Sequence, residues 1–184
     1  MNSRPISFYV RRPDAVKIAD EALADGKDRY GPLWREIIHR RSGEPTTLTG
    51  VEPAVKWPGA MVSFSRGEID RGGLLAAAAV DPASAAGNTC EAHFYMAEAA
   101  IIRGAVADAK PDLQVAIDTC PPAFTEAAAA RGDDATQRRV AQRKRKALVP
   151  WQTAAASPQE RRCLGVTPQE LRATARIPSC TRAT

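Results

Sequence analysis

The segment from Cys90 to Pro121 constrains the fold more than any other part of this chain. It predicts two helices, Thr89 to Arg103 and Val106 to Thr119, with Gly104 between them and a pair of prolines after the second. Glycine commonly ends a helix because it accepts left-handed backbone angles, and proline cannot continue one. Pro111 stands inside the second pattern, so we expect that helix to begin late or to bend there. The segment therefore predicts an antiparallel helical hairpin.

Alanine occupies the positions where the two helices would pack. Ala97 and Ala100 lie in the first helix, and Ala109 and Ala116 lie in the second. Small side chains at these positions let antiparallel helices approach closely. Larger apolar residues would fill the space around them, namely Phe94, Met96, Ile101, Leu113 and Ile117.

Shorter helical patterns lie on both sides of the hairpin. The segment from Ser42 to Val55 carries glycine and proline without periodicity and predicts a loop or an interrupted helix. Aromatic residues make up only 5% of the chain, which is few for a sheet, so we expect an all-α fold. The expected further helices are Asp14 to Asp25, Pro32 to Arg41, Pro58 to Ser65, Glu68 to Val80, and Ala123 to Arg131, the last ending at Gly132.

The hairpin resembles the tetratricopeptide repeat (TPR) of bacterial proteins, a 34-residue unit of two helices. Ala97 stands where the family often has glycine, and Pro111 is a second departure from the pattern. Upstream segments, including Leu33-Trp34 and Trp57 to Gly67, show weaker likeness, so the resemblance covers about residues 13 to 130. The hairpin residues that carry it are Phe94, Tyr95, Met96, Ala97, Gly104, Ala109, Leu113, Ala116 and Pro121.

The resemblance implies a short solenoid of about three helical hairpins that acts as a protein-interaction module, a scaffold or adaptor. In the TPR family the first helices of successive units line a concave groove for a peptide or protein. The matching helix here would present His93, Phe94, Tyr95 and Glu98 to that partner. Since about three units are the least that such an array can use, the chain is alternatively a fragment of a longer TPR protein.

Charge divides the chain into unlike parts. Up to Ala130 there are 14 Lys and Arg residues against 17 Asp and Glu, and after it 12 against 4. We expect residues 1–12 to be an extension, 13–130 the repeat region, and 131–184 a disordered basic tail with at most a short helix from Pro168 to Arg176. A second hypothesis is a binder of nucleic acid or of an anionic surface. Its basic residues would be Arg138, Arg139, Arg143, Lys144, Arg145 and Lys146.

Motifs for catalysis and cofactor binding are not found in this sequence. His39 has no second His or Cys at helical spacing and His93 has only Cys90, three residues before it, so no metal site is expected. Phosphate-loop, dinucleotide-binding and hydrolase signatures are missing as well. The paired carboxylates Asp133 and Asp134 are expected to be solvated in a loop. We therefore predict a protein that is not an enzyme and needs no cofactor.

The four cysteines do not form a metal-binding pattern. Cys90 and Cys120 open and close the hairpin, but packed helix axes lie about 8 to 10 Å apart, so a disulfide requires converging ends. Two buried free thiols are the favoured expectation. No membrane span or secretory signal stands out, which predicts a cytoplasmic protein, or a periplasmic one if the true start lies upstream.

Overall fold

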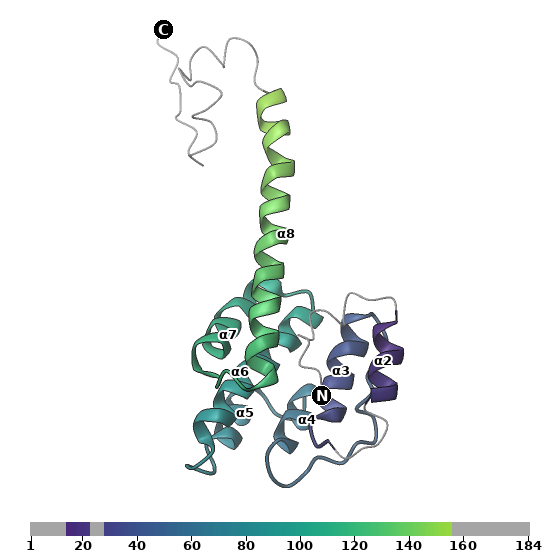
Figure 1. Ribbon diagram of the computed structural model, residues 1–184, viewed down its shortest axis with the longest axis vertical. Coiled ribbons are helices and arrows are strands. Elements are labelled where there is room, and N and C mark those ends of the chain that lie inside the picture. Colours follow the sequence, from purple (N-terminus) through teal and green to yellow (C-terminus); the bar gives the residue numbers. More distant parts are fainter. Residues whose placement is uncertain (1–13, 23–27, 156–184) are drawn as a thin grey trace. The chain divides into compact units, whose positions relative to one another are not determined.

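Seven α-helices and no strand make up the described part of the chain, residues 14–22 and 28–155 of a computed structural model (Figure 1). The all-α expectation is confirmed for these residues. The chain divides into two compact units, Met1–Gln137 and Arg138–Thr184. The helices are α2 (Ala15–Ala22), α3 (Gly31–Arg41), α4 (Gly59–Ser65), α5 (Arg71–Ala78), α6 (Ala85–Ile102), α7 (Val106–Thr119) and α8 (Thr125–Ala155).

The predicted hairpin is present as α6 and α7, which lie side by side (Figure 1). Gly104 has a φ of +78° at the reversal, and the amide of Ala105 donates to the carbonyl of Ala100 at 2.9 Å. This left-handed glycine is the helix stop that the sequence indicates. Pro111 lies inside α7, which begins at Val106, so the helix does not begin late.

The start of α6 differs from the prediction. The helix begins at Ala85, four residues before the predicted start at Thr89, so Asn88 lies within it. The Asn88 amide donates to the carbonyl of Ala78 at 3.4 Å and to the Ser84 hydroxyl at 3.1 Å. Asn88 therefore ties α6 to the end of α5 instead of capping the helix.

Cys90 and Cys120 form a disulfide, so the expectation of free thiols is wrong for this pair. Their Cα atoms lie 5.1 Å apart, within the range that the bond requires. Cys120 follows the last turn of α7 on extended backbone, with φ of −69° and ψ of 134°. This extended residue brings the end of α7 toward α6, which spacing between ideal helix axes does not anticipate.

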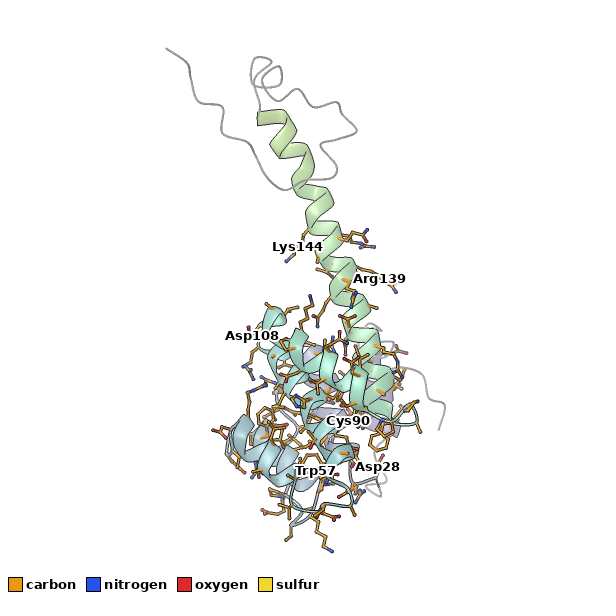
Figure 2. The ribbon with its side chains drawn as sticks, turned by 90° about the vertical axis from the view of Figure 1, so that its left-hand side faces the viewer. Asp28, Trp57, Cys90, Asp108, Arg139 and Lys144 are labelled. Atoms are coloured by element: carbon orange, nitrogen blue, oxygen red, sulfur yellow. A yellow bond between two sulfur atoms is a disulfide. The ribbon has the colours of Figure 1, made fainter. Side chains whose placement is uncertain are left out.

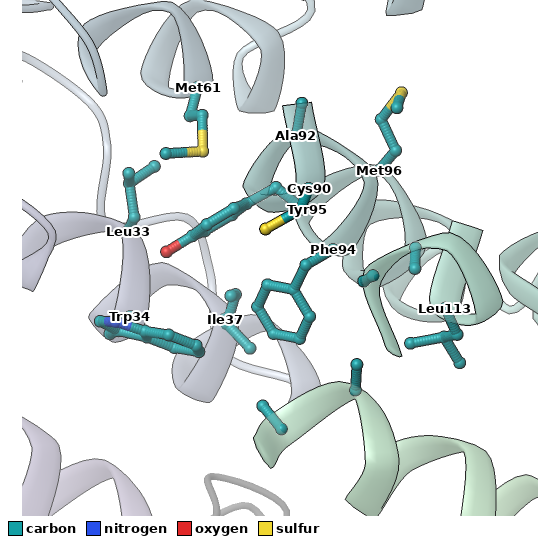
Figure 3. Packing of buried hydrophobic residues seen from close by; sticks show 14 of the residues in the cluster. Leu33, Trp34, Ile37, Met61, Cys90, Ala92, Phe94, Tyr95, Met96 and Leu113 are labelled. Carbon is teal, nitrogen blue, oxygen red and sulfur yellow. The ribbon is translucent and has the colours of Figure 1, made fainter. Parts of the chain in front are cut away.

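The core concentrates three of the chain's few aromatic rings between α3 and α6. The ring centroid of Trp34 lies 5.4 Å from that of Phe94 and 5.8 Å from that of Tyr95 (Figure 3). Phe94 and Tyr95 meet edge to face at 5.3 Å. Around the rings, alanines at the α6–α7 contact are buried, as their spacing predicts. Few aromatic residues are therefore enough to form this core, because closely packed alanines fill the contact between α6 and α7.

The segment between α3 and α4 is a loop, and buried contacts hold it. Leu48 is fully buried, and one carboxylate oxygen of Glu36 accepts from the Thr47 amide at 2.6 Å and the Thr47 hydroxyl at 3.0 Å. Where the loop enters α4, a Cβ on Gly59 would lie 1.8 Å from the carbonyl oxygen of Ala54. Only glycine permits this close approach.

The last helix does not end at Gly132, so that predicted stop is wrong. α8 continues to Ala155, and residues 131–155 are helical where a disordered tail was expected. Glycine inside a helix costs about 1 kcal/mol relative to alanine. Burial of Ala129, Ala130 and Asp133 on both sides of Gly132 offsets that cost. The rest of the expected tail, with the short helix at 168–176, lies outside the described residues, as do residues 1–13.

Candidate ligand pocket between α3 and α6

A pocket of about 210 Å³ lies between α3 and α6, with Ser65 of α4 at its edge. Its apolar wall is built from two residues of each long helix, Leu33 and Ile37 of α3 and Ala99 and Ile102 of α6. Leu33 and Ile37 occupy the buried stripe of α3, which Pro32 starts at its favoured first-turn position. The helical spacing that builds the core therefore also positions one side of the pocket.

Tyr95 lies at the buried end of the pocket. Only 3% of the residue is exposed, and its hydroxyl has no hydrogen-bond partner in the described part of the chain. The Trp34 and Phe94 rings hold its ring in place (Figure 3). Burial, reinforced by the charge of Glu126, raises the pKa of Tyr95 well above its ordinary value. The hydroxyl thus keeps its proton and remains a free donor.

Glu98 also lines the pocket and belongs to a buried network of three charged side chains. Nη1 of Arg41 donates to both carboxylate oxygens of Glu98, at 3.0 and 3.1 Å, and to Oδ1 of Asp133 at 2.8 Å. Burial raises the pKa of Glu98 well above its ordinary value, and Asp133 raises it further, while Arg41 opposes the shift. Asp133 is buried, so the expectation that it is solvated in a loop is wrong.

The mouth of the pocket carries two exposed arginines, Arg40 from α3 and Arg103 from the end of α6. Arg40 has only a loose ion pair with Glu36, at 3.9 Å. Arg103 forms no ion pair with another described residue. Because Glu36 and Glu98 are buried, the exposed charges in the lining are those of the two arginines.

A second buried carboxyl cluster lies at the other side of Tyr95. Oε2 of Glu91 accepts from the Tyr30 hydroxyl at 2.9 Å and from Nε1 of Trp57 at 2.6 Å, and burial raises the pKa of Glu91. Burial also raises the pKa of Glu126 to about 7, with further contributions from Glu91 and Asp28. This cluster joins α6, the loop before α4 and the first turn of α8.

The four residues predicted to meet a partner lie in three different environments. Tyr95 and Glu98 line the pocket. Phe94 is fully buried in the core and has no surface to offer. Nδ1 of His93 lies 2.8 Å from Oδ1 of Asp112, which also accepts from Arg71, so His93 belongs to a contact between α5, α6 and α7.

Sequence reasoning missed the contribution of α3 to the pocket. The Leu33-Trp34 pair indicates only a weak likeness to the repeat. Arg40, one turn beyond Ile37, gave no separate signal. The resemblance to repeats could have identified α3 as a first helix beside the hairpin, and so as the opposite wall.

The basic cluster lies on the second part of α8. Arg138, Arg139, Arg143 and Lys144 are exposed there, and Figure 2 labels two of them. Arg138 also takes part in an interaction, so it is not a free cation. Arg145 and Lys146 belong to the same helix, but their side chains lie outside the described ones.

Two general searches complete the description of possible sites. Among the residues that the structure describes, no group of three or more His, Cys, Asp or Glu side chains is placed to hold a metal ion. None of the described helices is long and apolar enough to cross a membrane.

No protein-family model, curated protein or solved structure matches this chain.

Proposed function

We propose that this protein is a non-catalytic interaction module that binds a peptide or protein segment in the pocket between α3 and α6. The observation that carries the proposal is the pocket itself, which has an apolar wall and two exposed arginines in its lining. A pocket of about 210 Å³ is smaller than the roughly 300 Å³ that small-molecule sites usually begin with. Its size suits one protruding side chain.

The resemblance to TPR proteins supports the same proposal. In that family the first helices of successive units line the partner groove, and α3 and α6 are the helices that match first helices here. These two helices contact one another and together line the pocket. We propose a TPR-like arrangement on this basis, with α6 and α7 as the best-matching unit.

Filling the pocket tests the proposal. Ala99 lines the pocket, so Ala99→Phe places a large ring in it, whereas Ala76→Phe on the exposed side of α5 is a matched control. A library of random twelve-residue peptides would be selected on the full chain. Peptides that bind the wild type and the Ala76→Phe variant but not Ala99→Phe support the proposal. Selected peptides that bind all three proteins equally would count against it.

The second candidate function is binding of nucleic acid or an anionic surface through α8. Four exposed basic side chains within seven residues favour it. Titration of a labelled oligonucleotide at low salt tests this candidate, because phosphate contacts weaken steeply as salt rises. Oligonucleotide binding that is lost in an Arg139→Ala/Arg143→Ala/Lys144→Ala variant would support this candidate. No binding at low salt would dismiss it.

A further inference from the structure

The pocket between α3 and α6 has a chemistry that specifies more than a generic partner. We propose that it recognises a segment in which a branched aliphatic side chain stands next to an acidic one, the aliphatic group entering the pocket and the carboxylate meeting Arg40 and Arg103. This inference rests on the proposed function and names the partner class for the same site.

The aliphatic half of the proposal follows from the wall and the volume. Leu33, Ile37, Ala99 and Ile102 present methyl and methylene groups, beside the aromatic residue Tyr95. A space of about 210 Å³ corresponds to roughly seven water molecules, at about 30 Å³ each. A leucine or isoleucine side chain would displace water that has few polar partners along this wall, which favours binding.

The acidic half follows from the charges at the mouth. The two carboxylates in the lining are buried: Glu98 accepts from Arg41, and Glu36 accepts from Thr47 and forms only a loose ion pair with Arg40 at 3.9 Å. Arg40 and Arg103 come from different helices, so a carboxylate between them would join both walls. A partner with a basic residue at this place would be repelled.

Peptide selection on the full-length protein tests the inference. We expect the pocket-dependent peptides, those lost on Ala99→Phe, to be enriched in Leu or Ile beside Asp or Glu. Pocket-dependent peptides of another chemistry, such as aliphatic residues beside lysine, would overturn this inference and leave the proposed function standing. Peptides that bind Ala99→Phe as well as the wild type would overturn both.

Charge-reversal variants then test the assigned contacts with the best selected peptide, labelled and measured by fluorescence polarisation. Arg40→Glu/Arg103→Glu should weaken binding by about tenfold or more and improve binding of the same peptide with its acid replaced by lysine. Arg131→Glu, a charge reversal at an exposed position of α8, is the control and should leave the affinity unchanged. Equal affinities for the two charge-reversal proteins would refute the acidic half.

Discussion

Arg41 and Asp133, 92 residues apart in the sequence, are joined by a hydrogen bond of 2.8 Å between Nη1 and Oδ1. The same nitrogen holds Glu98, so one guanidinium connects the last turn of α3, the middle of α6 and the part of α8 just after Gly132. Both carboxylate side chains are 2% exposed. The network therefore stabilises the meeting of three helices far from one another in the chain.

Removing the guanidinium should destabilise the protein strongly. Arg41→Ala leaves two buried carboxyls without their cation, and breaking a buried pair in this way costs about 3–5 kcal/mol. Glu98→Gln should cost much less, because its amide still accepts from Arg41 and can donate to Asp133. Urea denaturation of the two variants gives the comparison. Similar midpoints for Arg41→Ala and the exposed control Arg131→Ala would contradict the prediction.

Stability should fall as pH rises through the range in which Glu126 ionises. Its pKa is raised by burial from 4.5 to about 7, so the folded state binds this proton more tightly than the unfolded state between those values. Stability is therefore full below pH 4.5 and is lost up to about pH 7, by roughly 3 kcal/mol at 1.36 kcal/mol per pH unit. Glu91 and Asp28 face Glu126 and oppose its charge.

Glu126→Gln separates this effect from other titrating groups. Glu91 and Glu98 also have raised pKa values, so their ionisation likewise lowers stability as pH rises. Asp20 and Asp112 have lowered pKa values, so their ionisation raises stability as pH rises. The informative quantity is thus the difference between variant and wild-type unfolding free energies across pH 4 to 8. A difference that stays constant would show that Glu126 does not titrate in this range.

Reduction of the disulfide should weaken the hairpin. The bond closes a loop with a sequence separation of 30 residues, for which constraint of the unfolded chain contributes about 3–4 kcal/mol. In a Cys163→Ser/Cys180→Ser background, we expect no reactive thiol before reduction and two after it, with a lower unfolding midpoint. Two thiols in both conditions would contradict the bond.

Gly59 and Gly72 should respond in opposite directions to the same substitution. Gly59→Ala places a Cβ against the Ala54 carbonyl oxygen, so the loop or α4 must shift, at a cost of about 1–3 kcal/mol. At Gly72 the nearest atom is Oδ1 of Asp70 at 3.4 Å, so Gly72→Ala in α5 should gain about 0.5–1 kcal/mol. Thermal unfolding of the two variants checks the signs.

The helices could be predicted where local signals agree with the packing. Glycine and proline located the α6–α7 hairpin, and the alanine spacing predicted its close contact. Gly132 misled the prediction because its local preference for ending a helix is outweighed by burial of its neighbours. The disulfide was missed for a similar reason, since the extended backbone at Cys120 depends on how α7 leaves the hairpin.

The site was predictable only in part. Tyr95 and Glu98 line the pocket as residues of the matching helix, but Phe94 lies one helical step away and faces the core. Arg41 and Asp133 carried no signal in the sequence, because their partners are distant in the chain. A single sequence indicates which residues share a helix face, whereas which faces meet depends on contacts formed by the whole fold.

The indole of Trp34 lies against both Phe94 and Tyr95, and so against the ring at the end of the pocket. Indole fluorescence responds to nearby dipoles and quenchers, so the fluorescence of Trp34 reports on changes around these rings. With Trp57 and Trp151 replaced by phenylalanine, the emission maximum and intensity of Trp34 would change when a partner occupies the pocket. The aromatic cluster that fills the core thus also provides a label-free signal for screening partners.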